Sequence, residues 1–174
     1  MTQEEYDNKA TSQDIPELKR VVNSYALHVG YDLGVTQLTS ITAYQNRNID
    51  RQYIGGKWVE DQNTFSQEVR ANTQFSDVVS VLIGGYYENR RFDVNTGAQN
   101  NIKTDTYALF GQATYALTKS IDLTGGLRAS RLSSESDFSG NSAWMIDSYQ
   151  SDKTENVVSP KAVSYTHLRA HETH

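Results

Sequence analysis

The segment Tyr25-Ala-Leu-His-Val-Gly-Tyr-Asp-Leu33 decides the fold class of this chain. Its odd-numbered residues are aromatic or aliphatic, and its even-numbered residues, such as Ala26 and His28, are small or polar. Successive side chains of a β-strand point to opposite faces, so this period of two predicts a strand with one apolar and one wet side. The chain is therefore expected to contain a sheet whose two faces differ in polarity.

Six further segments carry strand signals, either a period of two or a run of β-branched and aromatic residues. One of them, residues 78–87, is apolar on both faces and is interrupted by Gly84 and Gly85. We therefore predict an all-β chain of about seven strands. The other five segments are residues 36–46, 64–72, 106–117, 121–130 and 157–165.

The predicted connections between these strands alternate between short and long. An antiparallel up-and-down barrel places alternate connections at opposite ends, and outer-membrane barrels have short periplasmic turns and long extracellular loops. This pattern predicts an antiparallel, up-and-down transmembrane β-barrel rather than a soluble β-domain. The short connections are Gly34, residues 74–77 and residues 118–120, and the long ones are residues 47–62, 88–105 and 133–156.

Charged and aromatic residues fit the same interpretation. Charges inside the predicted strands fall on the wet face, as expected because a basic residue facing lipid at mid-membrane costs about 2–4 kcal/mol. Arg131 has the parity of the apolar face, and we expect it at a strand end beside a loop. Tyrosines near the ends of the apolar stripes predict an interfacial girdle. The wet-face charges are Glu68, Arg70, Asp122 and Arg128, and the tyrosines are Tyr25, Tyr31, Tyr107 and Tyr115.

Composition excludes several classes of protein. No apolar run approaches the roughly 20 residues of a membrane-spanning helix, which excludes a helical membrane protein. The chain has no cysteine, so disulfides, thiolate metal sites and cysteine nucleophiles are excluded. A net charge of −5 argues against nucleic acid as a partner. Residues 1–5 lack the basic and apolar regions of a secretory signal, so we expect the true N-terminus of an exported protein to lie upstream.

Six short segments, taken in order and spacing, make the chain similar to TonB-dependent outer-membrane receptors. The resemblance covers residues 20–165 and lies within the barrel domain. It implies import of a ferric siderophore or, in some branches, cobalamin, haem or glycans, with energy relayed through TonB. The segments are Leu38-Thr-Ser-Ile-Thr-Ala-Tyr44, Phe65-Ser-Gln-Glu-Val-Arg70, Ile83-Gly-Gly-Tyr-Tyr87, Tyr107-Ala-Leu-Phe-Gly-Gln-Ala-Thr-Tyr115, Leu123-Thr-Gly-Gly-Leu-Arg128 and Ser159-Pro-Lys-Ala162.

The resemblance also suggests a domain organisation. Barrels of this family have about 22 strands around an N-terminal plug, and nothing in the chain resembles the plug or the segment that contacts TonB. We expect an extracellular loop remnant at residues 1–19 and a partial barrel at residues 20–162. Residues 163–174 resemble translated sequencing-adapter read-through, and we expect this tail to be non-native. An open sheet leaves two unpaired edges, so the chain alone is not expected to insert or to transport.

Candidate ligand contacts are expected in the long loops and at the strand ends beside them. Arginine and aromatic side chains suit anionic, catechol-bearing iron complexes. The expected partners are outer-membrane lipid, TonB through the plug region, and a ferric siderophore or similar ligand. The candidate contacts are Tyr53, Trp58, Arg90, Arg91 and Trp144.

No catalytic, metal or cofactor site is predicted. His167, His171 and His174 are spaced like metal ligands on a helix, but they lie in the expected non-native tail. Ser24 and His28 share one face and imitate the serine and histidine of lipid-hydrolysing barrels, and we interpret both as lumen lining. Gly55-Gly56-Lys57 lacks the strand–loop–helix context of a phosphate loop and is interpreted as a turn.

Two alternatives remain open at this point. A passive porin-type barrel shares the strand pattern but lacks a plug, so the upstream coding sequence would distinguish it from a receptor. A soluble β-sandwich binding module would give a monodisperse monomer from residues 20–165 without detergent.

Overall fold

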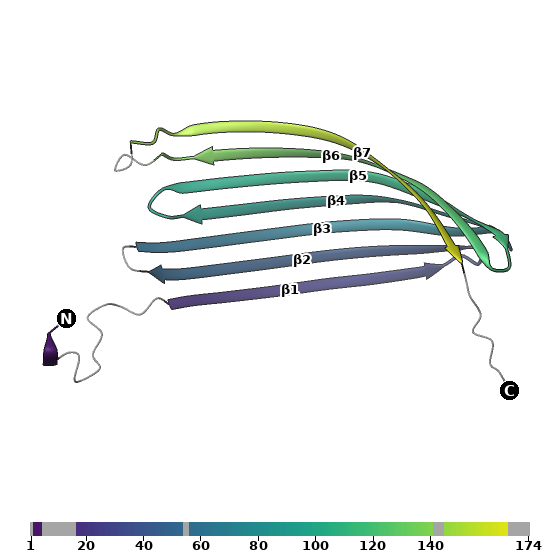
Figure 1. The fold of residues 1–174 in the computed structure, drawn as a ribbon, viewed down its shortest axis with the longest axis horizontal. Helices are drawn as coiled ribbons and strands as arrows, with labels where there is room; N and C mark the ends of the chain where they lie inside the picture. The colour runs from purple at the N-terminus through teal and green to yellow at the C-terminus, as the bar shows by residue number, and fades with distance from the viewer. Residues whose placement is uncertain (1, 5–16, 54–55, 141–144, 167–174) are drawn as a thin grey trace.

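The computed structural model describes residues 2–4, 17–53, 56–140 and 145–166. Seven strands form one antiparallel sheet in which each strand pairs with its neighbours in sequence (Figure 1). The all-β, up-and-down prediction is therefore confirmed. The strands are β1 (Glu17–Asp32), β2 (Thr36–Tyr53), β3 (Gly56–Ser76), β4 (Val79–Asn95), β5 (Gln99–Thr118), β6 (Ile121–Phe138) and β7 (Tyr149–Thr166).

The sheet is an incomplete barrel, open along β1 and β7. It is a single layer, and among the described residues the only buried hydrophobic side chains are Ile49, Ala98 and Ala108. Every residue of β1 is exposed. Stability within the sheet therefore comes from ladder hydrogen bonds and cross-strand pairs rather than from a packed core.

The pairing register sorts the side chains onto two faces. Residues directly opposite on neighbouring strands share a face, and one such line joins Val29, Ser40, Val69, Gly85 and Leu109. We call this side the apolar face. Its side chains are exposed although they are apolar, and Leu109 reaches 73%. Other exposed members are Leu27, Leu38, Ile83, Leu127 and Val158.

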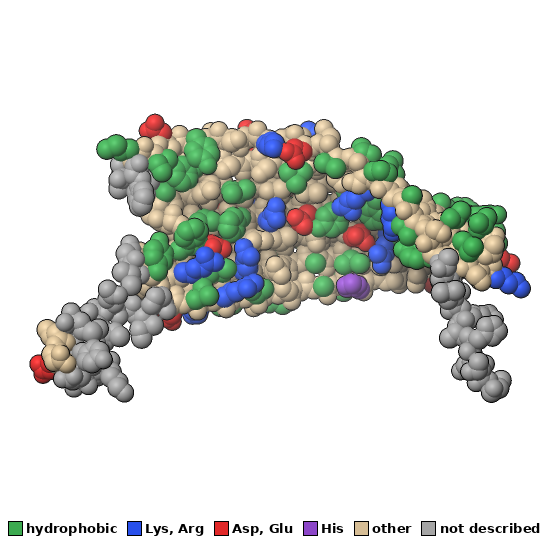
Figure 2. All heavy atoms as spheres, viewed as in Figure 1, with side chains coloured by type: hydrophobic (Ala, Val, Ile, Leu, Met, Phe, Trp, Pro, Cys, Tyr) green, Lys and Arg blue, Asp and Glu red, His purple; other side chains and the backbone are tan. Residues whose placement is uncertain are grey.

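The opposite side, which we call the charged face, carries His28 together with Glu68, Arg70 and Arg128 in the middle of the strands. Figure 2 shows basic and acidic side chains on this side. The predicted placement of the charges is correct. Glu68 and Arg70 on β3 lie opposite Tyr86 and Gly84 on β4. Gly84 lies opposite Phe110 on β5, and Phe110 lies opposite Arg128 on β6. All of these positions lie on the same side of the sheet. In the middle of the strands, charge is thus separated from the exposed apolar surface.

Aromatic rings mark one border of the apolar face, in a line that we call the aromatic row: Tyr44, Phe65, Tyr87 and Tyr107. The ring centroids of Phe65 and Tyr87 are 6.4 Å apart, and those of Tyr87 and Tyr107 are 5.0 Å apart. The hydroxyl of Tyr44 donates to Asn63 at 2.9 Å, and that of Tyr87 donates to Asp105 at 3.0 Å. Each tyrosine of the row has an apolar body and a polar tip, as the predicted girdle requires.

The opposite border is marked by Tyr31 on β1 and Tyr115 on β5. Tyr107 and Tyr115 are eight residues apart on one face, which is roughly 27 Å along a strand at about 3.4 Å per residue. A tilt of about 40° reduces this to roughly 20 Å of height, close to the ~25 Å band of outer-membrane barrels. The apolar face has the height of a membrane.

The prediction of long loops is wrong. β2 continues to Tyr53, β4 continues to Asn95 and β6 continues to Phe138, so hairpins replace most of residues 47–62 and 88–105. The connection between β6 and β7 remains longer. The physical reason is that both faces of a strand are wet beyond the aromatic row, so the alternation of apolar and polar residues disappears while the ladder continues.

Arg131 also differs from its expected place. It has the predicted parity, opposite Tyr107 on the apolar face, but β6 runs seven residues beyond it to Phe138. Arg131 therefore lies level with the aromatic row and not at a strand end.

The expected domain borders fall inside strands. β1 begins at Glu17, before the expected end of the loop remnant at residue 19, and β7 continues past Ala162 to Thr166. Residues 5–16 and 167–174 lie outside the described residues.

Candidate functional site

The charged face carries a group of ionic and aromatic side chains beyond the aromatic row, which we call the arginine cluster: Arg47, Arg51, Trp58, Glu60, Gln62 and Phe92. The Glu60 carboxylate lies at its centre, 3.3 Å from a guanidinium nitrogen of Arg51 and 3.8 Å from one of Arg47. Glu60 is only 8% exposed. Two cations thus share one shielded anion, which fixes the positions of both guanidinium groups.

Aromatic rings hold the same arginines from the other side. The guanidinium carbon of Arg47 lies 5.9 Å from the ring centroid of Phe92, and that of Arg51 lies 5.8 Å from the ring centroid of Trp58. Both distances are within the range of a cation–π contact. The arginines of the cluster are therefore held in place while part of each guanidinium remains open to a ligand.

Two arginines of this region have donor groups without a partner among the described residues, and only that of Arg90 is exposed to a ligand. Arg47 donates to the side-chain oxygen of Gln62 at 2.7 Å, but its buried Nε has no partner among the described residues. Arg90 lies two positions from Phe92 on the same face and is exposed, and the described part of the chain offers it no ion pair. The site can accept an anion or a ring of oxygen acceptors.

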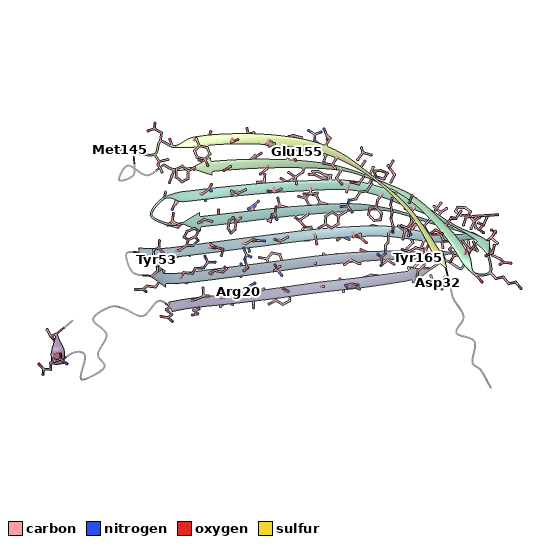
Figure 3. All side chains as sticks on the ribbon, viewed as in Figure 1. Arg20, Asp32, Tyr53, Met145, Glu155 and Tyr165 are labelled. Atoms are coloured by element: carbon pink, nitrogen blue, oxygen red, sulfur yellow. The ribbon has the colours of Figure 1, made fainter. Side chains whose placement is uncertain are left out.

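The sequence-predicted contacts divide between the two faces. Tyr53, Trp58 and Arg90 lie on the charged face near the same end of the sheet, and Figure 3 shows Tyr53 at the end of β2. Arg91 is the neighbour of Arg90 in a strand and faces the opposite side. Trp144 lies outside the described residues.

Sequence reasoning missed Arg47, Arg51, Glu60 and Phe92, which are the most closely connected members of the cluster. All four fell in segments interpreted as loops. Parity could have found them, because Arg47 and Arg51 continue the odd-numbered series of β2 on the charged face, and Glu60 continues the even-numbered series of β3.

A second charged group lies on this face between the two aromatic borders. Glu68 and Arg70 form an ion pair at 3.3 Å, and the hydroxyl of Tyr86 donates to Glu88 at 2.7 Å. Arg128 lies over the rings of Tyr86 and Phe110, at 5.6 and 5.7 Å from their centroids. This middle band of the charged face is therefore polar at the depth where the other face is apolar.

The imitations of catalytic motifs do not form sites. Ser24 accepts a hydrogen bond from Gln45 at 3.0 Å, while His28 lies four residues further along β1, roughly 14 Å away at about 3.4 Å per residue. Lys57 pairs with Asp50 at 2.8 Å within the β2–β3 hairpin. The described residues contain no group of three or more His, Cys, Asp or Glu placed to hold a metal ion.

Comparison with known families identifies the fold. The family model described as "TonB dependent receptor-like, beta-barrel" matches residues 4–171. The chain belongs to this TonB-dependent receptor family. Members of the family are transporters of the Gram-negative outer membrane and not enzymes. The apolar face is therefore the lipid-facing side of a barrel wall, and the charged face is its lumen side.

Solved TonB-dependent receptors share the arrangement of strands. The ferric yersiniabactin uptake receptor FyuA from Yersinia pestis superposes with a TM-score of 0.70 at 21% identity over 84% of this chain. The ferric-catecholate import receptor Fiu from E. coli K12 in its open form gives 0.70 at 13% over 87%. The siderophore receptor PiuA from Acinetobacter baumannii gives 0.69 at 11% over 86%. A search of curated protein sequences finds no match.

The chain spans 25%, 34% and 30% of the lengths of these three receptors. Within the described residues, no helix is long and apolar enough to cross a membrane.

The strands extend far beyond the aromatic row only at the end where Tyr53 lies. On β5, eight residues precede Tyr107 but three follow Tyr115. Because outer-membrane barrels are longer on their extracellular side, we infer that the arginine cluster lies at the outer mouth.

Proposed function

We propose that this chain is part of the wall of a TonB-dependent receptor that imports an anionic ferric siderophore. The observation that carries the proposal is the arginine cluster on the lumen side, together with the family membership. Arg47 and Arg51 of the cluster share the single carboxylate of Glu60, and the exposed Arg90, two positions from Phe92 on the same face, adds a third cation. Charge-assisted hydrogen bonds from guanidinium groups and contact with aromatic rings suit carboxylate and catecholate iron complexes.

The similar solved receptors support the proposed class of ligand. FyuA is an uptake receptor for ferric yersiniabactin, Fiu is an import receptor for ferric catecholate, and PiuA is a siderophore receptor. The family match also favours a plugged receptor over a passive porin or a soluble β-sandwich. In the proposed complete barrel, TonB acts through the plug region and the strands of this chain provide wall and ligand contacts.

The test uses the complete receptor gene from which this chain derives. Its coding sequence upstream of the strands should contain a plug domain. Expressed in a Gram-negative strain deleted for its own siderophore receptors, it should restore uptake of radioactive iron supplied as a catecholate or mixed carboxylate complex. Deletion of TonB should abolish that uptake. Uptake that persists without TonB, or the absence of a plug, would overturn the proposal in favour of a diffusion barrel.

A further inference from the structure

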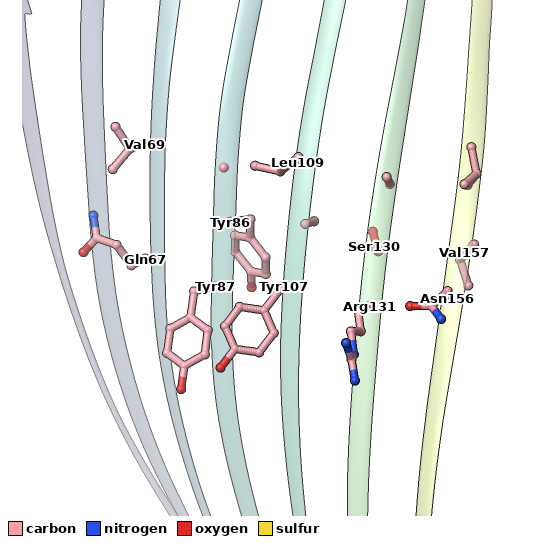
Figure 4. Close-up of a pocket in the computed structure, with 14 residues that line it drawn as sticks. Gln67, Val69, Tyr86, Tyr87, Tyr107, Leu109, Ser130, Arg131, Asn156 and Val157 are labelled. Carbon is pink, nitrogen blue, oxygen red and sulfur yellow. The ribbon is translucent and has the colours of Figure 1, made fainter.

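An open groove lies on the lipid-facing side of the sheet, across β3 to β7 (Figure 4). Its volume of 660 Å³ lies within the roughly 300–1,000 Å³ typical of ligand sites. The depression is deepest where side chains are small: Ala129 lies directly between Leu109 and Val158, and Gly85 lies directly between Val69 and Leu109. An apolar depression is therefore built into a surface that faces hydrocarbon.

The outer end of the groove is polar. Arg131 lies directly opposite Tyr107 on one side and Asn156 on the other, so all three are level with the aromatic row. Figure 4 shows Tyr107, Arg131 and Asn156 at one end of the groove, with Val69 and Leu109 toward the other end. The groove thus runs from the membrane interface into the apolar band.

Arg131 is exposed, and no ion pair or hydrogen bond reaches it from the part of the chain that the structure describes. Lys103 provides the contrast, because it lies on the same side beyond the aromatic row and is 3.7 Å from Asp105 and 4.0 Å from Glu135. A cation at the interface is favourable only where an anion or water reaches it. The groove therefore ends at an available positive charge.

We propose that this groove binds one phosphorylated lipid of the outer leaflet, with an acyl chain over Ala129 between Leu109 and Val158 and a phosphate against Arg131. Charge and polarity match at both ends, because guanidinium is a strong phosphate binder and the floor and walls are hydrocarbon. The inference rests on the proposed function only in assuming that β3 to β7 belong to a closed barrel. The identity of the imported ligand does not enter it.

A second copy of the chain fits the groove less well. Its partner surface would have to bring an anion to Arg131. On the apolar face Asp105 lies near that level, but it already accepts hydrogen bonds from Tyr87 at 3.0 Å and Asn89 at 2.8 Å and faces Lys103. The outer leaflet, in contrast, supplies phosphate and acyl chain in one molecule at the depth of the groove.

The test measures bound lipid on the complete receptor, extracted in mild detergent and stripped of lipid, by native mass spectrometry with added rough lipopolysaccharide. We expect one lipid per barrel. Arg131→Gln should lower its apparent affinity by about tenfold, the effect of losing one charge-assisted hydrogen bond. Arg131→Lys should retain most of it. Ala129→Phe, which fills the floor, should also lower it, whereas Lys103→Gln should not.

Folding of each variant is checked by the mobility of the unheated barrel on gels. If Arg131→Gln fails to fold, Arg131→Lys and Ala129→Phe carry the comparison. Three outcomes would overturn the inference. The first is wild-type lipid occupancy in both Arg131→Gln and Ala129→Phe, and the second is equal binding of dephosphorylated lipid. The third is cross-linking of a second receptor copy through residue 129. Iron uptake is measured separately, so a receptor that binds lipid but imports no siderophore would refute the proposed function and leave the groove intact.

Discussion

The ring of Phe110 lies directly across from Gly84, so close that a β-carbon built on Gly84 would lie 2.5 Å from the ring Cζ. The same β-carbon would lie 2.9 Å from the backbone oxygen of Val69. The ring can turn away, but the backbone of a paired strand cannot easily do so. Gly84 is therefore required by the close approach of its neighbours.

Gly84→Ala is expected to destabilise the complete barrel by about 1–3 kcal/mol, the usual cost of overpacking. The adjacent Gly85→Ala is the matched control, because its β-carbon would lie 3.6 Å from the nearest Leu109 carbon, an ordinary contact. The midpoint of urea unfolding, measured for each variant from the gel mobility of unheated samples, would compare the two. Equal midpoints would show that the contacts with the Phe110 ring and the Val69 backbone oxygen are not restrictive.

Val29→Arg and His28→Arg test the assignment of faces on neighbouring residues of β1. Val29 lies on the apolar face, four residues from Tyr25 and from Leu33, whereas His28 lies on the lumen side. An arginine that faces lipid costs up to about 2–4 kcal/mol, the value at mid-membrane, so Val29→Arg should lower the yield of folded barrel in the outer membrane. His28→Arg should fold normally. Similar yields for the two variants would contradict the face assignment.

Arg90→Gln and Arg91→Gln form a similar pair for ligand binding. We expect Arg90→Gln to weaken binding of the ferric siderophore by about tenfold, as for the loss of one hydrogen bond to a charged group. Arg91→Gln should leave the Kd unchanged because Arg91 lies on the outer side of the wall. Fluorescence titration of both variants measures this, and an effect of Arg91→Gln as large as that of Arg90→Gln would refute the assignment.

Glu60→Gln should have opposite effects on stability and on ligand binding. Its carboxylate is shielded and holds Arg47 and Arg51 together, so its neutralisation should cost about 1–2 kcal/mol of stability. The freed guanidinium groups should bind an anionic ligand more tightly. Asp50→Asn is the control, since it removes the exposed Asp50–Lys57 pair, whose loss should cost under about 1 kcal/mol. Weaker siderophore binding in Glu60→Gln would contradict this account.

The middle of each strand could be predicted from sequence, and the ends could not. Val29, Leu109 and Leu127 lie where one face meets lipid and the other meets the lumen, and that difference produces the period of two. Beyond the aromatic row no such difference exists, so Arg47 and Glu60 were placed in a loop although they are in strands.

Gln67 shows a second limit of pattern reading. It interrupts the apolar stripe of β3, yet its amide accepts a hydrogen bond from Thr42 at 2.6 Å and donates one to Ser40 at 2.9 Å. A polar side chain on a lipid-facing surface is tolerated when its neighbours satisfy it. The partners lie on β2, about 25 residues away in sequence, and only the register of the two strands identifies them.

The open edges of the sheet mean that the stability of this chain is shared with strands it does not contain. β1 offers sixteen residues along one seam and β7 offers eighteen along the other, and their outward ladder groups gain hydrogen bonds only when a neighbouring strand joins them. A substitution at either seam will therefore change how the whole ring closes, while a substitution in β4 will act mainly within this sheet.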